Sequence, residues 1–338
     1  MPVTSKKIAE LSGVSRGTVD RVLHQRGNVR PEVERRVKEI AERLGYVPNR
    51  AGKALSSRNR PVRIGILLQS VGNPFFDKIK EGIAAAKQEY SDFTIDSELV
   101  ELKGYHISEQ LAQIDRLVEK QVQLLILTPI NSPEISEKID GLSKKGISVI
   151  TLNSDIEHAG RLCYVGCHYI RSGETAAGLM GLMLKEGNVG IVTGSVKMLG
   201  HNQRISGFLS VCKKEYPGLK VIDIAENNDD DTQSEQAVFE MLKCYPEISA
   251  LYFTAGGVTG GIRAIELLGR DDILVITCDN TLQIQRYLQA GRISATVSQK
   301  PFRQGYEAMK AALEYLINQK PLSTEIYMDN EIIIKQNM

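Results

Sequence analysis

From residue 62 onward the chain alternates short apolar runs with amphipathic stretches, and this alternation constrains the fold more than any other feature. The apolar runs have the length and composition of buried strands. They lie at 63–68, 124–127, 148–152, 189–192, 251–253 and 273–276. Between them, helical periodicity marks 76–90, 110–120, 175–185, 205–216 and 304–317. Short apolar strands that alternate with amphipathic helices predict an α/β fold with doubly wound parallel sheets.

This region of about 275 residues is large for one such sheet, so we expect two lobes. The whole chain has 338 residues, of which 42% are apolar and 25% charged, an ordinary globular composition. No apolar run approaches the roughly 20 residues that span a membrane. The first residues, MPVTSKK, have no apolar segment behind them, so no signal peptide is expected. We therefore expect a cytoplasmic protein with no membrane partner.

The five cysteines are odd in number and show no C-x-x-C spacing. Cys163, Cys167 and His168 are close in sequence, but a fourth metal ligand at usable spacing is missing. We expect reduced thiols, with no metal site and no cofactor.

The net charge of +1 conceals an uneven distribution. Residues 1–60 hold 14 of the 42 Lys and Arg residues but only 6 of the 41 Asp and Glu residues. A small basic module joined to a mildly acidic body is typical of a nucleic-acid-binding protein with a separate second function. On charge alone, a merely solvated basic segment is the alternative.

The basic segment begins with two predicted short helices. Thr4 and Ser15 are suitable N-caps for helices over 6–11 and 16–23, and Gly13 interrupts the chain between them. Two helices joined by a tight turn with glycine form a helix-turn-helix unit. The second helix begins with short polar side chains and carries arginine, which suits entry into a DNA major groove.

A third amphipathic helix is predicted after Pro31, which is well placed at a helix start. Its apolar residues at helical spacing are Val33, Val37, Ile40, Ala41 and Leu44. This helix would close a three-helix core of about 45 residues.

Three motifs follow one another along the chain. They are IAELSGVSRGTVDRVL (8–23), LGYVPNRA (44–51) and NPFF (73–76). In this order they resemble the lactose-repressor family of bacterial transcription regulators. The resemblance extends over essentially the whole chain, and it implies a body similar to periplasmic sugar-binding proteins, with two α/β lobes, three crossovers and a ligand in the cleft.

The resemblance also implies DNA-binding roles for residues of the basic N-terminal segment, called the head from here on. Arg16 and Gly17 fall at recognition-helix positions that read bases, and Arg21 falls where an arginine commonly reaches a base edge. The residues that look like phosphate-positioning residues are Thr4, Ser15, Thr18 and Asn28. Double-stranded operator DNA is the expected partner.

Asp20 departs from the serine that is usual at its position. An aspartate that faces DNA would repel phosphate. It therefore either accepts a hydrogen bond from a cytosine amino group or braces Arg21 or Arg16, and we favour the brace.

Residues 49–58, which begin with Asn49 and Arg50, resemble the family's hinge helix. In this family the segment is folded only when two subunits pair on DNA, so a homodimer is expected. Leu55 matches the leucine that is wedged between base pairs in the minor groove. The alternative is a plain flexible linker.

These features divide the chain into three parts. We expect a DNA-binding domain at 1–46, a hinge at 47–60 and a two-lobed domain at 61–338 that binds the effector and dimerises. 

In parallel sheets, ligands bind at the carboxyl ends of strands, so the loops there are candidate sites. The first such loop, 69–76, contains Asn73, Phe75 and Phe76. An amide beside aromatic rings suits a sugar, although Asn73 could instead serve only the turn. The loop lacks G-x-G-x-x-G, so a nicotinamide enzyme loses its main support.

The resemblance implies three further ligand residues, Arg204, Asp279 and Gln299. Carboxylate, guanidinium and amide groups can share hydrogen bonds with vicinal hydroxyls, and each would be costly if left unpaired. The alternative for Arg204 and Asp279 is a salt bridge between the lobes.

Two departures from the family's pattern concern the ligand. Asn153 and Asp155 stand where many relatives have an Asp-Arg pair, and Gly256 stands where ribose-type binders often have asparagine. We include all three among the candidate ligand residues. The glycine-rich turn at 256–261 could hold a phosphate with backbone N–H groups, or it could give close packing or room for a bulkier ligand.

Three functions compete at this point. The favoured one is a DNA-binding repressor, not an enzyme, whose operator affinity depends on a small effector, expected to be a carbohydrate. An α/β enzyme with a regulatory head should show a catalytic signature such as G-x-S-x-G, and none is present. A sugar transport receptor should show a signal peptide and no basic head.

Overall fold

The computed structural model describes residues 5–23, 29–44 and 61–338. The head contains the three expected helices, α1 (Ser5–Ser12), α2 (Arg16–Leu23) and α3 (Pro31–Arg43). Each helix contributes one fully buried side chain to their common core, namely Ile8, Val19 and Val37. Gly13 forms the turn at a φ of 65°, in the left-handed region that favours glycine.

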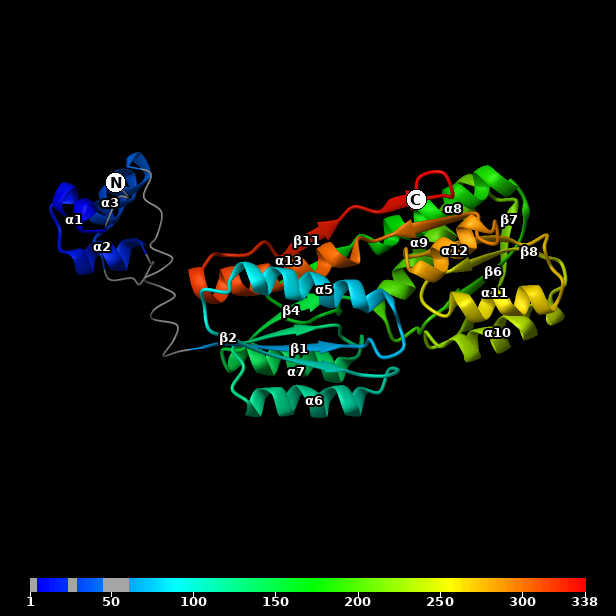
Figure 1. Cartoon of the computed structure of the whole chain (residues 1–338), viewed down its shortest axis with the longest axis horizontal. Coiled ribbons are helices and arrows are strands. Elements are labelled where there is room, and N and C mark those ends of the chain that lie inside the picture. The colour runs from blue at the N-terminus through cyan, green and yellow to red at the C-terminus, as the bar shows by residue number, and fades with distance from the viewer. Residues whose placement is uncertain (1–4, 24–28, 45–60) are drawn as a thin grey trace. The chain divides into compact units, whose positions relative to one another are not determined.

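The first lobe, called lobe 1, is built on a six-stranded sheet in the order β11-β5-β4-β3-β1-β2. Its strands are β1 (Val62–Leu68), β2 (Ile95–Glu101), β3 (Leu124–Leu127), β4 (Ser148–Leu152), β5 (Cys163–Cys167) and β11 (Glu325–Met328). Helices α6 (Ile107–Glu119) and α7 (Pro133–Lys144) cover one face, and α5 (Phe75–Glu89) and α13 (Pro301–Asn318) cover the other (Figure 1). Burial on both faces explains why β3 is an unbroken apolar run.

The second lobe, called lobe 2, has a six-stranded sheet in the order β12-β10-β9-β8-β6-β7. Its strands are β6 (Gly187–Thr193), β7 (Leu219–Glu226), β8 (Ile248–Phe253), β9 (Leu274–Cys278), β10 (Ala295–Ser298) and β12 (Glu331–Ile333). Its helices are α8 (Tyr169–Leu184), α9 (Leu199–Glu215), α10 (Asp231–Cys244), α11 (Val258–Leu267) and α12 (Leu282–Gln289). β12 pairs antiparallel with β10, whereas the neighbouring pairs are parallel. The expected pair of α/β lobes is confirmed, with an antiparallel edge strand added.

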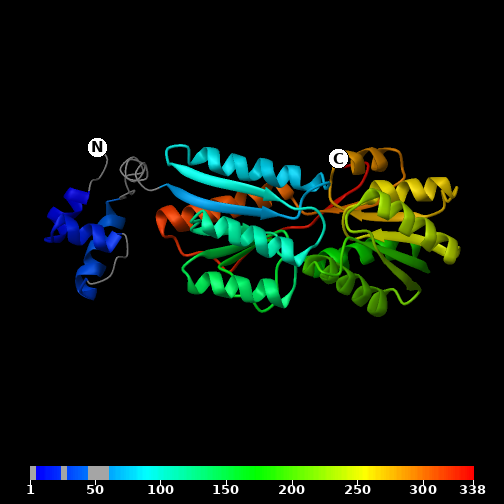
Figure 2. The ribbon, with the colours of Figure 1, turned by 90° about the horizontal axis from the view of Figure 1, so that it is seen from below.

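The chain passes between the lobes three times, as the resemblance implied. The passages lie between β5 and α8, between β10 and α13, and between β11 and β12. The last passage is the final segment in red, which runs from lobe 1 to lobe 2 (Figure 2). Hydrogen bonds join the passages, because Asn330 Nδ2 donates to the His168 carbonyl at 3.4 Å and Cys167 Sγ to the Gln299 carbonyl at 3.4 Å.

Two helices of lobe 2 begin earlier than their periodicity predicts. α8 begins at Tyr169 rather than 175, and α9 at Leu199 rather than 205. Gly173 and Gly200, in the parts of α8 and α9 that the periodicity missed, lower helix propensity, whereas Gly173 and Gly207 let the two helices touch. A Cβ on Gly173 would lie 1.9 Å from the Arg204 carbonyl oxygen, and one on Gly207 would lie 2.1 Å from that of Ile170.

None of the helices described in the three resolved ranges is long and apolar enough to cross a membrane.

Candidate ligand-binding site

The carboxyl ends of strands from both lobes line one cleft. Lobe 1 contributes Gln69, Asn73, Phe75, Phe76, Tyr105, Asn153 and Ser154. Lobe 2 contributes Tyr169, Met198, Gly200, His201, Arg204, Asp229, Ala255, Gly256, Asp279 and Gln299. The structure thus brings together eight of the nine ligand residues expected from sequence, and the exception is Asp155.

Arg204 is the buried cation of the cleft, only 3% exposed, in the second turn of α9. Its Nη1 donates to the Thr254 carbonyl at 2.7 Å, and its guanidinium lies 4.5 Å from the centre of the Tyr169 ring. Nε and Nη2 have no hydrogen-bond partner among the described residues. These two N–H groups share one edge of the guanidinium, the edge that binds two oxygens at once.

Asp279 follows β9 and is 6% exposed. Its backbone has a φ of 76°, a left-handed conformation that Asp tolerates better than most residues. Oδ1 accepts a hydrogen bond from Gln299 Nε2 at 2.5 Å. Burial raises the pKa of the Asp279 carboxyl above its usual value, and the Arg204 charge opposes this rise. Arg204 and Asp279 both belong to lobe 2, and no ion pair within 4.0 Å joins these two described residues, so the interlobe salt bridge is wrong.

The loop after β1 places Asn73 and both phenylalanines in the cleft. Asn73 Oδ1 accepts a hydrogen bond from the Phe75 backbone at 3.1 Å, so the amide oxygen serves the turn. The Asn73 Nδ2 group faces Gly256, where an added Cβ would lie 3.2 Å away. The rings of Phe75 and Phe76 meet edge to face at 5.3 Å. Gln69, 8% exposed, has no partner for either polar side-chain atom among the described residues.

Asn153 connects the lobes through its side chain. Its Nδ2 donates to the Tyr169 hydroxyl at 3.0 Å and to Gln299 Oε1 at 3.4 Å. The Tyr169 hydroxyl donates to the same Gln299 oxygen at 2.9 Å. Burial raises the pKa of Tyr169 well above its usual value, which keeps this hydroxyl protonated as a donor.

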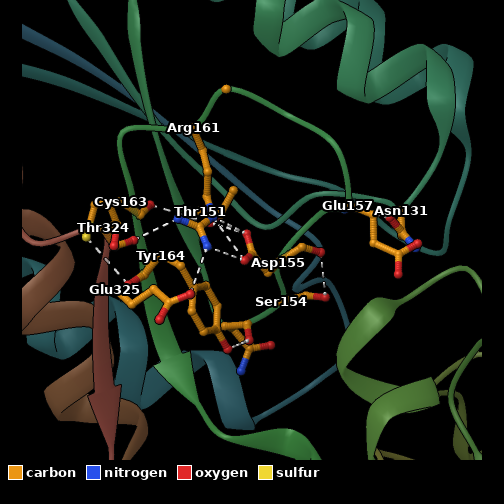
Figure 3. Close-up of polar contacts among 12 residues, drawn as sticks. Asn131, Thr151, Ser154, Asp155, Glu157, Arg161, Cys163, Tyr164, Thr324 and Glu325 are labelled. Atoms are coloured by element: carbon orange, nitrogen blue, oxygen red, sulfur yellow. Dashed lines mark hydrogen bonds and ion pairs between the residues drawn. The ribbon is translucent and has the colours of Figure 1, made fainter.

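Asp155 does not line the cleft, which corrects the expectation from sequence. Its carboxylate binds Arg161, with Nε to Oδ1 and Nη2 to Oδ2 both at 2.7 Å (Figure 3). Arg161 Nη1 donates to the Thr324 carbonyl at 2.7 Å, directly before β11. Asp155 therefore pairs with Arg161, six residues later in the chain, and this pair holds β11 against the rest of lobe 1.

Sequence reasoning missed Tyr105, His201 and Asp229. In the acidic run 229–231, Asp230 caps α10 by accepting from the Thr232 and Gln233 backbones at 3.0 and 3.1 Å. Asp229 instead faces the cleft, where it accepts hydrogen bonds from the Tyr105 hydroxyl and the Gly256 backbone. No pattern in the sequence distinguishes it from its neighbours.

His201 lies beside this pair. Its Nδ1 accepts from the Ser195 backbone at 3.0 Å, and its ring meets Tyr105 edge to face. Burial lowers the pKa of His201, so the imidazole is neutral near pH 7.

The glycine-rich turn at 256–261 is a poor phosphate site. The Gly256 N–H already donates to the Asp229 carboxylate, and the Gly260 N–H donates to Asp231 Oδ1 at 3.2 Å. Two carboxylates at the turn would repel an anion.

In the head, α2 presents its first residues outward. Arg16, Gly17 and Arg21 are exposed, whereas Thr18 and Asp20 are half-buried. Exposed Ser15 accepts a hydrogen bond from the Thr18 backbone at 3.1 Å, as expected of a cap. The remaining DNA-contact predictions fall outside the described residues; they are Thr4, Asn28, Asn49, Arg50 and Leu55.

Comparison with known proteins accounts for both parts of the chain. Residues 4–49 match the lacI family of bacterial regulatory proteins, and residues 64–320 match the periplasmic binding protein domain. Catabolite control protein A of Priestia megaterium is 25% identical over 348 residues, covering 100% of this chain and 99% of that protein. The chain belongs to the periplasmic binding protein domain family, whose model matches most of its length, and it carries a lacI-family head at its N-terminus.

The body of this lacI-family regulator also resembles transport proteins. The ribose import binding protein of Bacillus subtilis (strain 168) is 26% identical over 281 residues, 82% of this chain and 89% of that protein. A solved glucose-galactose binding protein from Geobacillus stearothermophilus is 24% identical and superposes with a TM-score of 0.76 over 82% of this chain and 99% of the other. This likeness shows the two-lobed fold.

The lacI-family regulator is thus a DNA-binding transcriptional regulator with a ligand-binding body, as expected from its head and motifs. Two relatives that match along the full length, catabolite control protein A and the transcriptional regulator pepR1 of Lactobacillus delbrueckii subsp. lactis, are regulators rather than enzymes.

Proposed function

We propose that this regulator is a cytoplasmic, homodimeric repressor whose operator affinity is set by a small carbohydrate held between the lobes. We assign DNA binding to residues 1–46, a hinge to 47–60, and effector binding with dimerisation to 61–338. Within the head, Arg16, Gly17 and Arg21 would face the bases.

The observation that carries the proposal is the unpaired edge of Arg204. A guanidinium that is 3% exposed, with two N–H groups lacking partners among the described residues, costs several kcal/mol unless a ligand supplies acceptors. Asp279 lines the same cleft and can accept from the ligand. A donor pair and an acceptor side by side fit vicinal hydroxyls.

The rest of the cleft supports a sugar rather than an apolar ligand. Gln69 offers an unpaired amide, and Asn73 offers an N–H donor from lobe 1. The Phe75 and Phe76 rings supply the apolar surface on which sugar C–H faces pack. Because both lobes contribute contacts, a bound sugar would favour one arrangement of the lobes over another.

A thermal-shift screen of the full chain tests this proposal. The panel contains pentoses, hexoses, sugar phosphates and nucleosides. A true effector at 100 times its Kd should raise the free energy of unfolding by about 2.7 kcal/mol, which gives a resolvable rise in Tm. Stabilisation by sugar phosphates alone, or by no carbohydrate, would contradict the proposal.

A further inference from the structure

Asp229 gives the cleft a carboxylate whose partners, within the part of the chain that the structure describes, are neutral. Its donors are the Tyr105 hydroxyl and the Gly256 backbone N–H. Asp229 makes no ion pair within 4.0 Å with any residue in the described ranges. The nearby lysines are engaged elsewhere, since Lys103 pairs with Asp230 at 3.9 Å and Lys197 Nζ donates to the Tyr105 carbonyl at 3.2 Å.

The backbone holds Asp229 in place at a conformational cost. Asn228 and Asp229 have φ values of 50° and 57°, two successive left-handed residues without glycine. Asn227 supports this turn, because its Oδ1 accepts from the Asp229 N–H at 2.9 Å and its Nδ2 donates to the Gly256 carbonyl at 2.8 Å. The turn directs Asp229 to the cleft, while Asp230 and Asp231 bind backbone N–H groups of α10 and α11.

Gly256 makes room for this carboxylate. A Cβ at Gly256 would lie 2.8 Å from Asp229 Oδ1, so a side chain at 256 would require the Asp229 carboxylate to shift. The absence of a side chain at 256 lets the carboxylate keep its hydrogen bond with the Gly256 N–H. Gly256 and Asp229 together place a charged acceptor in the cleft.

The charges of the cleft lining do not balance. Arg204 is opposed by Asp279, and Asp229 remains without a cation. His201, the other basic side chain in the lining, is neutral because burial lowers its pKa. An anionic ligand would add to the excess negative charge, whereas a cationic group would neutralise it.

We propose that the effector is an amino sugar or a similar polyhydroxylated amine, an inference that rests on the proposed function. Its ammonium group binds Asp229, and its hydroxyls bind the unpaired edge of Arg204. Asp229 is the residue that selects the amine over the neutral sugar. Arg204 also requires a ligand in the cleft, because its Nε and Nη2 have no partner among the described residues.

Matched ligands test the inference directly. Calorimetry with the full chain at pH 6.5, where the amine is protonated, would measure the Kd of glucose, glucosamine and N-acetylglucosamine. The corresponding galactose and mannose series would be measured in the same way. Because a charged hydrogen bond is at stake, at least one amine should bind about tenfold or more tightly than both its parent sugar and its N-acetyl form. The N-acetyl form keeps the nitrogen and removes the charge.

Two variants assign the preference to the residue. Asp229→Asn keeps the shape and should reduce the amine-to-parent ratio to about one. Asp230→Asn makes the same change one residue away, at a cap where Asn serves as well as Asp, and should leave the ratio unchanged. Neither variant should alter the unfolding transition of the ligand-free protein greatly, which checks folding.

The outcomes separate this inference from the proposed function. Tight binding of a neutral sugar with no preference for its amine overturns the inference and leaves the proposed function standing. An amine preference that survives Asp229→Asn overturns the role of Asp229. Failure of every sugar and every amine to bind contradicts both.

Discussion

At the scale of single residues, the cleft depends on backbone conformations that few side chains tolerate. Asn153, Asp229 and Asp279 all line it, with φ values of 68°, 57° and 76°. Asn and Asp enter this left-handed region more readily than other residues with a Cβ. The same residues supply hydrogen-bonding groups, so the local chemistry of Asn and Asp provides both the turn and the contact.

Asp279→Asn is the sharpest test of the cleft at this scale. Asn tolerates the φ of 76° and can still accept the Gln299 hydrogen bond, so the fold should persist. Loss of a charged acceptor should weaken effector binding about 10- to 100-fold, measured by calorimetry. Asp272→Asn, an exposed aspartate with a side chain 62% accessible, is the control and should bind as wild type.

The same variant has a pH signature without ligand. Burial raises the folded-state pKa of Asp279 above 3.8, so between the two values the native state binds more protons than the unfolded state. The contribution of Asp279 to the free energy of unfolding therefore falls as pH rises through this window. Above the raised pKa the buried carboxyl is charged, and the full cost of burying that charge lowers the stability of the protein. Asp279→Asn should be at least as stable as wild type at pH 7, with a difference that shrinks toward pH 4 in urea unfolding. A variant much less stable at pH 7 would contradict this account.

The loops that line much of the cleft could be predicted from the sequence, because apolar runs indicate where the strands end. Arg204, Asp279 and Gln299 were expected from the family resemblance. Asp155 was misplaced because Arg161, six residues later, binds it away from the cleft. Asp229 was missed because identical neighbours in a row give no sign of which one turns inward.

At the scale of elements, α8 and α9 are joined through glycine, and this contact positions the cleft. Gly173 of α8 lies against the carbonyl of Arg204 in α9. The close packing of these two helices therefore fixes the position of the Arg204 guanidinium. The periodicity of the sequence starts both helices too late, because glycine lowers helix propensity where helix packing requires it. Packing outweighs propensity here.

Two alanine substitutions on α8 separate packing from propensity. At Gly173 a Cβ would lie 1.9 Å from a backbone oxygen, so Gly173→Ala should lower the free energy of unfolding by about 1–3 kcal/mol and weaken effector binding as α9 moves. At Gly178 a Cβ meets nothing within 4 Å, so Gly178→Ala should raise stability by about 0.5–1 kcal/mol and leave binding unchanged. Urea unfolding and calorimetry measure both quantities. Equal effects of the two substitutions would refute the close contact.

At the scale of the whole molecule, the proposed function requires that a ligand in the cleft act on the DNA-binding head. The cleft draws residues from lobe 1 and lobe 2, and three chain passages joined by hydrogen bonds connect them. A ligand shifts such a system only by binding one arrangement more tightly than the other. The alternation of strands and helices predicts both lobes, whereas the passages themselves were expected only from the family resemblance, since strand order is invisible to local patterns.

The most direct test of the central claim is the effect of the effector on operator affinity. Operator DNA is first selected from a random duplex pool with the full chain, and its binding is then followed by fluorescence anisotropy as the effector from the screen is added. We expect the operator Kd to change at least about fivefold for wild type and not for Asp279→Asn at the same ligand concentration. Arg16→Ala should lose the preference for the selected operator while still binding the effector. An effector that binds the cleft and leaves the operator Kd unchanged would contradict the account.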